Sequence, residues 1–169
     1  YMMVEAAPPE GEEERPSGLY RSQDGGENWE KILYIDEATG INDLAMDTTN
    51  PRILYAGAWR VERKPWALLS GNEDGGIFKT TDGGDNWEKL ENGLPTGFLG
   101  RIGLAIAKTK PGRAWAQVTA KEKEDGGLYR TEYAGKTWAR INPDRRLQGR
   151  GWYYSHIEAD PTDENTIWA

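Results

Sequence analysis

Short stretches of alternating apolar and polar residues recur along the chain, and glycine-rich turns separate them. This alternation is typical of β-strands with one buried face, and no stretch has a convincing helical period. The alternation predicts groups of three, four, four and two strands. These are 1–6, 18–21 and 29–33; 41–46, 53–59, 76–80 and 87–90; 102–107, 114–119, 127–131 and 138–141; and 153–159 and 166–169.

A similar turn precedes the last strand of each of the first three groups. It runs from 22 to 29, from 80 to 87 and from 131 to 138. A turn that returns at about 50 to 60 residues marks a repeat protein. We expect Asp24 and Asp82 to accept backbone N–H groups inside their own turns. Tyr133 replaces the aspartate in the third copy, so that turn should be weaker or differently bonded.

The repeated turn resembles the Asp-box, or BNR repeat, whose pattern is Ser/Thr-x-Asp-x-Gly-x-Thr/Asn-Trp/Phe. The matching residues are Ser22, Asp24, Gly26, Trp29, Thr80, Asp82, Gly84, Trp87, Thr131, Gly135 and Trp138. A second pattern, at 47–55 and 160–168, resembles the turns of sortilin-like (VPS10) propellers. The resemblance implies an all-β fold of β-propeller blades, each a four-stranded antiparallel sheet. Asp-boxes occur in sialidases, sortilin-type receptor domains and xyloglucan-cleaving glycoside hydrolases, where they are structural.

On this basis the whole chain, 1–169, is expected to be one array of about three blades. Residues 1–34 would hold strands two to four of a partial blade, 41–91 and 101–142 two full blades, and 153–169 the start of another. Propellers close at about four to eight blades. We therefore expect a partial propeller that self-associates or joins the rest of a parent propeller. The alternative is a compact three-sheet domain with open ends.

Composition narrows the possible partners. The net charge of −7 argues against nucleic-acid binding, and no apolar run approaches the roughly 18 residues of a membrane helix. The chain has no cysteine and one histidine, so neither a metal site nor another cofactor is expected. The acidic run at 10–14 is interpreted as a solvated loop. The absence of cysteine favours a bacterial source and a secreted or periplasmic location.

The candidate chemistry lies in loops that share one face of such blades. Two of these loops, 60–70 and 145–156, combine cations with aromatic residues. Aromatic rings can stack on sugars or peptide side chains, and arginine binds carboxylates. The predicted ligand-binding residues are Arg60, Arg63, Trp66, Arg101, Arg150, Trp152, Tyr154 and His156. The alternative is that the aromatic residues pack between blades and the cations are solvated; for His156 alone, packing is the stronger interpretation.

Two functions remain open from the sequence. The first is a sortilin-like scaffold that binds carbohydrate, peptide or protein. The alternative is part of a BNR-repeat glycoside hydrolase, xyloglucanase- or sialidase-like. Glycoside hydrolysis usually needs two carboxylates, and Asp36, Glu37, Asp43 and Glu62 lie in or beside the ligand-face loops. No motif singles one of them out, so the sequence does not require an enzyme. A pair of inner-strand carboxylates facing one groove would favour the hydrolase.

Overall fold

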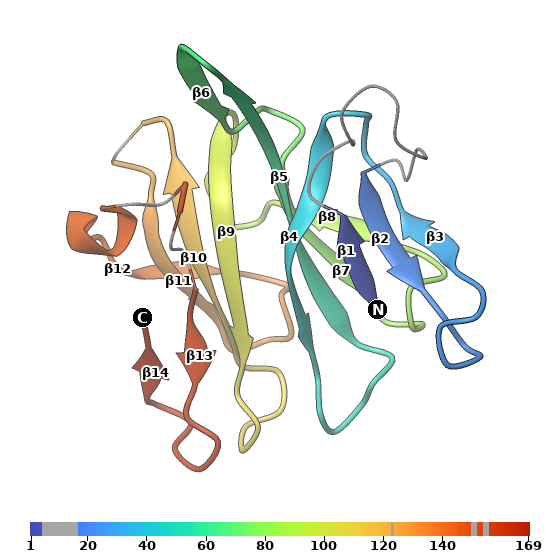
Figure 1. Ribbon diagram of the computed structural model, residues 1–169. Coiled ribbons are helices and arrows are strands. Elements are labelled where there is room, and N and C mark those ends of the chain that lie inside the picture. Colours follow the sequence, from blue (N-terminus) through green and yellow to red (C-terminus); the bar gives the residue numbers. More distant parts are fainter. Residues whose placement is uncertain (5–16, 123, 150–151, 154–155) are drawn as a thin grey trace.

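The computed structural model describes residues 1–4, 17–122, 124–149, 152–153 and 156–169, and its strands form separate antiparallel sheets in chain order (Figure 1). The first sheet contains β1 (Met2–Val4), β2 (Gly18–Arg21) and β3 (Glu30–Leu33). The second contains β4 (Thr39–Met46), β5 (Leu54–Lys64), β7 (Gly76–Thr80) and β8 (Glu88–Leu90), with β6 (Ala67–Ser70) paired to β5. The third contains β9 (Leu99–Ile106), β10 (Ala114–Ala120), β11 (Gly127–Thr131) and β12 (Ala139–Asn142). The 3-10 helix η1 (Arg145–Gln148) follows, and then the pair β13 (Glu158–Ala159) and β14 (Ile167–Trp168).

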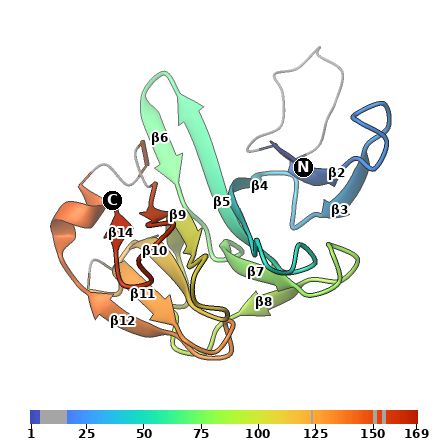
Figure 2. The same cartoon turned by 90° about the horizontal axis from the view of Figure 1, so that it is seen from below.

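The sheets splay like a fan; in the second and third sheets, β4 and β9 lie toward the inside and β8 and β12 toward the outside (Figure 2). Apolar side chains fill the space between neighbouring sheets. Between the second and third sheets, Tyr55 and Ile77 pack with Ile102, Val118 and Trp138. The all-β architecture predicted from the alternation is confirmed.

Most strands lie within a few residues of their predicted positions, but the one expected at 153–159 is much shorter. Of the described residues in this segment, only Glu158 and Ala159 are in a strand, paired with Trp168 and Ile167. A strand continues only where a neighbouring strand satisfies its backbone hydrogen bonds. The strand β14 has two residues, so β13 pairs over two residues as well. Tyr153 lies in a turn instead. Residues 5–6 and 154–155, also predicted as strand, lie outside the described residues.

The first two repeated turns are closed by the same side-chain bonds. The Asn28 N–H donates to Asp24 Oδ1 (2.9 Å), and the Asn86 N–H donates to Asp82 Oδ1 (3.0 Å), which confirms the expected bonds. The hydrogen bonds from Asn28 lower the pKa of Asp24 to about 2. The stabilisation by this carboxylate is therefore present above its ordinary pKa of 3.8 and is lost as the pH falls toward 2.

The third turn keeps only half of this arrangement. Thr131 Oγ1 still accepts the N–H groups of Tyr133 (3.2 Å) and Gly135 (3.0 Å), but Tyr133 has no carboxylate to close the turn. Ala134 adopts a left-handed φ of 54°, a conformation that costs energy for a residue with a Cβ. The expectation of a differently bonded third turn is confirmed.

A cation at the end of one sheet supports the turn of the next. Arg21 donates to the Gly83 carbonyl (2.9 Å) and pairs with Asp85 (2.8 Å). Lys79, at the matching place in the second sheet, donates to the Ala134 carbonyl (2.7 Å). The third turn thus gains from its neighbour part of the support that its missing aspartate would supply.

The inner strands of the second and third sheets are joined more directly. A register shift in β4 between Ile41 and Asp43 turns two side chains toward β9. Asn42 Nδ2 donates to the Ile102 carbonyl (2.6 Å), and Asp43 Oδ2 accepts the Leu104 N–H (2.8 Å). Gly57 of β5 permits this approach, because a Cβ there would lie 3.2 Å from Ile102. We call Asn42, Asp43 and their contacts on β9 the inner-strand clamp.

Replacing Thr80 by valine should destabilise the chain by about 1–3 kcal/mol. Its hydroxyl accepts the buried N–H of Gly84 (3.0 Å), which valine would leave unpaired. The matched change, Ser22→Ala in the exposed first turn, should cost much less, because water replaces the lost acceptor. Urea unfolding of both variants measures the difference; equal losses would show that burial of the turn is unimportant.

Candidate functional site

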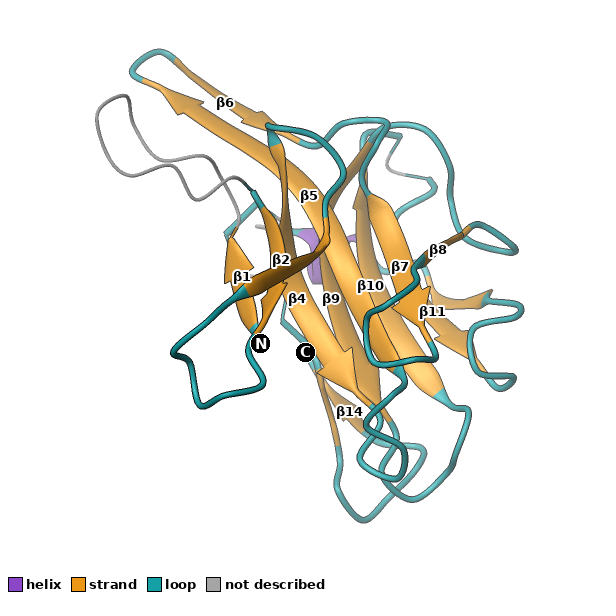
Figure 3. Ribbon diagram, turned by 90° about the vertical axis from the view of Figure 1, so that its right-hand side faces the viewer, coloured by secondary structure: helices purple, strands orange, loops and turns teal. Residues whose placement is uncertain are grey.

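The loop expected at 60–70 is instead a β-hairpin. Strand β5 continues past its buried half to Lys64, turns at Pro65 and Trp66, and returns as β6. The hairpin projects beyond the sheets (Figure 3). Trp59 Nε1 donates to Ser70 Oγ (3.1 Å) across its base. The expected long loop is thus largely a pair of strands, whose hydrogen bonds satisfy the backbone groups of the segment.

The charges of the hairpin are arranged around one carboxylate. Glu62 pairs with Lys64 (3.0 Å) and with Arg60 (3.4 Å), and the contact with Lys64 lowers the pKa of Glu62. Trp66 lies at the tip and is 81% exposed. It is available to a ligand and contributes little to packing.

The segment after η1 brings two aromatic residues to the hairpin. The Trp152 and Tyr153 rings pack edge to face, with centroids 5.3 Å apart and planes at 72°. They line a groove of about 490 Å³, which we call the hairpin groove; its other lining residues are Val61, Arg63, Lys64, Pro65, Ala67 and Leu68. Two loops that are far apart in sequence, and that were both predicted to bind a ligand, therefore meet in one groove.

Arg101 and Asp43 lie deeper, at the inner strands. The Arg101 guanidinium carbon lies 5.3 Å from the centroid of the Trp59 ring. Asp43 belongs to the inner-strand clamp, and burial raises the pKa of its carboxyl. The Leu104 and Leu44 N–H groups and the nearby charges of His156 and Arg101 oppose this shift. Because backbone N–H groups already bond both Asp43 oxygens, we assign this carboxylate to the blade contact.

His156 borders a second, polar depression of about 420 Å³, together with the Asp144–Arg146 ion pair. This pair is 2.6 Å long, and its hydrogen bonds lower the pKa of Asp144 to about 2. His156 is exposed, so the interpretation of it as a packed residue was wrong for its side chain. Of the other predicted ligand-binding residues, Arg150 and Tyr154 lie outside the described residues.

The remaining carboxylates weighed for catalysis have local roles. Asp36 accepts the N–H (2.8 Å) and O–H (2.6 Å) of Thr39 and so holds its own loop. Glu62 serves the hairpin, as described above, and Glu37 does not line the hairpin groove. Among the described residues, no group of three or more histidines and carboxylates could hold a metal ion. In the residues that the structure describes, no helix is long and apolar enough to cross a membrane.

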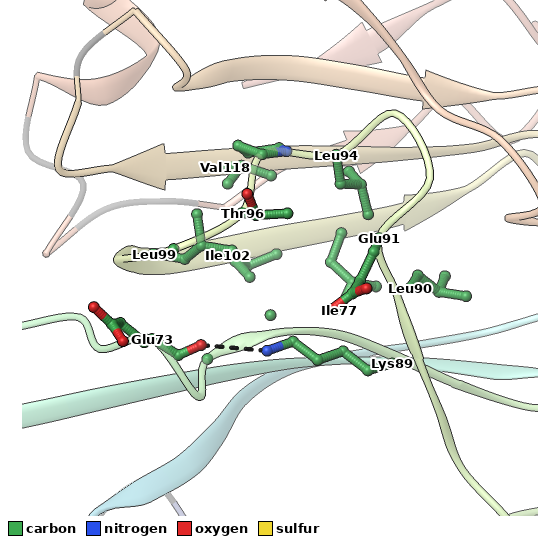
Figure 4. Close-up of a pocket in the computed structure, with 14 residues that line it drawn as sticks. Glu73, Ile77, Lys89, Leu90, Glu91, Leu94, Thr96, Leu99, Ile102 and Val118 are labelled. Carbon is green, nitrogen blue, oxygen red and sulfur yellow. Dashed lines mark hydrogen bonds between the residues drawn. The ribbon is translucent and has the colours of Figure 1, made fainter.

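A more enclosed cavity of about 240 Å³ lies between the second and third sheets (Figure 4). Its apolar lining includes Ile77, Leu99, Ile102 and Val118, which belong to the core between these sheets. At its rim, Lys89 Nζ donates to the Glu73 carbonyl (3.3 Å). The sequence analysis did not find this cavity, because each lining residue has the ordinary pattern of a packed strand. We assign the cavity to blade packing.

Comparison with known proteins finds similarity to two xyloglucanases. A xyloglucanase from Paenibacillus sp is 35% identical over 106 residues, which cover 60% of this chain and 9% of that protein. A probable oligoxyloglucan-reducing end-specific xyloglucanase from Neosartorya fischeri is 24% identical over 86% of this chain and 21% of its own length. The chain is similar to xyloglucanases. It spans less than a quarter of either relative, and no protein-family model matches it.

A solved structure supports the same fold. The GH74 xyloglucanase from Xanthomonas campestris superposes with a TM-score of 0.63 at 19% identity, over 88% of this chain and 22% of that one. The sheets of this chain are β-propeller blades, as predicted. The relatives fit the glycoside-hydrolase type of propeller and give no support to the sortilin type.

Substituting Asp43 by asparagine should change the pH dependence of stability. The folded state holds the Asp43 proton more tightly than the unfolded chain does, because burial raises the folded pKa. Raising the pH above the ordinary value of 3.8 therefore costs the wild type stability until the raised pKa is passed. Asp43→Asn lacks this step. The unfolding free energies of both proteins can be measured between about pH 3 and pH 8. The two curves should converge or cross as the pH rises. Parallel curves would contradict a raised pKa of Asp43 in the folded state.

Proposed function

We propose that this chain is a carbohydrate-binding segment of a glycoside-hydrolase-type propeller that acts on polysaccharide. The observation that carries the proposal is the hairpin groove, where Trp152 and Tyr153 face the β5–β6 hairpin. Aromatic rings can stack on the apolar C–H face of a sugar ring, while the polar edge of the aromatic side chain remains in contact with water. The similarity to two xyloglucanases gives the groove a matching substrate class.

The predicted ligand-binding residues divide into two groups under this proposal. Trp66 and Trp152 would contact the sugar at or beside the groove, which Arg63 also lines, whereas His156 would border the second, polar depression. Arg101 would act indirectly, since its guanidinium packs against Trp59 at the inner strands. The repeated turns at Asp24 and Asp82 are proposed as Asp-boxes with a structural role only.

The catalytic carboxylates of a hydrolase are not assigned to this chain. Inverting hydrolysis uses a pair about 6.5–9.5 Å apart across the sugar. Asp43, the inner-strand carboxylate with a raised pKa, is committed to backbone bonds on both oxygens. We therefore propose that the chain contributes substrate binding within a larger propeller, in a secreted protein, and that further blades complete it.

Replacing Trp152 by alanine should weaken the binding of xyloglucan oligosaccharides about tenfold, or about 1.4 kcal/mol. The indole supplies one wall of the groove, and the smaller side chain removes the stacking surface. Calorimetric titration of the wild type and the variant measures the change.

Tyr133→Ala is the matched control for this experiment. Tyr133 is 68% exposed but lies in the turn after β11, at the opposite end of the sheets from the hairpin. Its loss should leave binding unchanged. Absence of carbohydrate binding by the wild type, or equal binding of xyloglucan by Trp152→Ala, would contradict the proposed function.

A further inference from the structure

The hairpin groove is lined by a cation, Arg63, that binding of a neutral sugar such as xyloglucan would not require. Arg63 pairs across the hairpin with Leu68, so both side chains lie on the face of the hairpin that lines the groove. Val61 lies on the same face, two residues before Arg63. The guanidinium therefore stands at an apolar surface, opposite Trp152 and Tyr153.

The neighbouring charges leave Arg63 without a partner among the described residues. Glu62 is the carboxylate next in sequence, but successive side chains of a strand point to opposite faces. Its two oxygens pair with Lys64 and Arg60. Within 60–64 this leaves three cations for one anion, and Arg63 makes no ion pair or hydrogen bond with another described residue. The groove is thus a local positive site in a chain of net charge −7.

A guanidinium beside aromatic rings favours a ligand that has both a carboxylate and an apolar face. Its N–H donors form a planar fork that matches the two oxygens of a carboxylate. The Trp152 and Tyr153 rings, with Val61 and Leu68, offer surfaces for the apolar face of a sugar ring. A neutral sugar would use the aromatic surface and leave the fork to water. A sugar that carries a carboxylate uses both.

We propose that the hairpin groove binds a uronic-acid unit of an acidic polysaccharide, with its carboxylate on Arg63 and its ring against Trp152. This inference rests on the proposed function and narrows its substrate class. The negative charge of the chain acts over the screening length of about 8 Å at physiological salt, so the contact with Arg63 decides recognition at the groove. An acidic peptide would satisfy Arg63 as well, but the paired aromatic rings and the polysaccharide-acting relatives favour the sugar.

The test compares two sugars on the intact chain. A tri-galacturonic acid probe carries the carboxylates, and a xyloglucan oligosaccharide is the neutral probe. Arg63→Gln should lower the affinity for the galacturonate probe at least about tenfold and leave binding of the neutral probe within about twofold. Arg63→Lys should recover part of the loss, because the ammonium keeps the charge without the fork. Added salt should weaken galacturonate binding to the wild type more than to Arg63→Gln.

Arg52→Gln is the matched control. Arg52 is also exposed but precedes β5, at the other end of that strand from the hairpin. It should not change binding of either probe. Circular dichroism of each variant checks that the sheets remain folded.

The outcomes separate this inference from the proposed function. If the neutral probe binds and the galacturonate probe binds no better, or if Arg63→Gln leaves galacturonate binding unchanged, the acidic-sugar inference is overturned and the proposed function stands. If neither sugar binds, both are overturned. If a short poly-glutamate peptide binds in an Arg63-dependent way and galacturonate does not, the groove is a peptide site and the inference fails.

Discussion

The structure depends on how closely the inner strands of neighbouring blades approach each other. The main-chain hydrogen bonds between strands of one sheet would not by themselves stop neighbouring sheets from sliding past one another. The inner-strand clamp prevents this, since Asn42 and Asp43 bond to backbone groups of β9 on either side of Gly103. Gly57 favours this close approach, because a Cβ there would lie 3.2 Å from Ile102. A second junction lies nearer the hairpin, where Asn72 and Leu99 exchange backbone bonds of 3.1 and 2.9 Å.

These junctions also position the hairpin groove, the proposed carbohydrate site. One wall of the groove is formed by the β5–β6 hairpin of the second blade. The other is formed by Trp152 and Tyr153, which follow η1 after the third blade. The aromatic pair and the hairpin face each other only while the two blades keep one relative orientation. The clamp and the groove are therefore linked, although they share no residue. Asp43 and the turn aspartates have similar roles, because each carboxylate accepts backbone N–H groups.

The repeated turns show how the chain tolerates variation in this scaffold. The first two turns close themselves with an aspartate. The third lacks it, and its tryptophan is also bonded differently: Trp29 and Trp87 donate to Gly26 and Gly84 carbonyls, whereas Trp138 is 5% exposed and packs edge to face on Tyr55. Packing and the Lys79 bond from the preceding blade take over from local hydrogen bonding. The third turn can therefore lack the aspartate, because contacts from the preceding blade stabilise it.

The sequence by itself determined the repeat, the strands and the bonds within the first two turns, because all three depend on residues close together in the chain. It also selected the loops that carry Arg63 and Trp152. Only the tertiary structure decided that 60–70 is a hairpin, that Trp152 and Tyr153 face it, and that Asp43 clamps a neighbouring blade. Alternation predicts which side of a strand is buried but not how far a strand continues once it leaves the sheet. The bonds of Asn42 and Asp43 join residues 60 and 61 positions apart in the chain, and no local pattern records such a pairing.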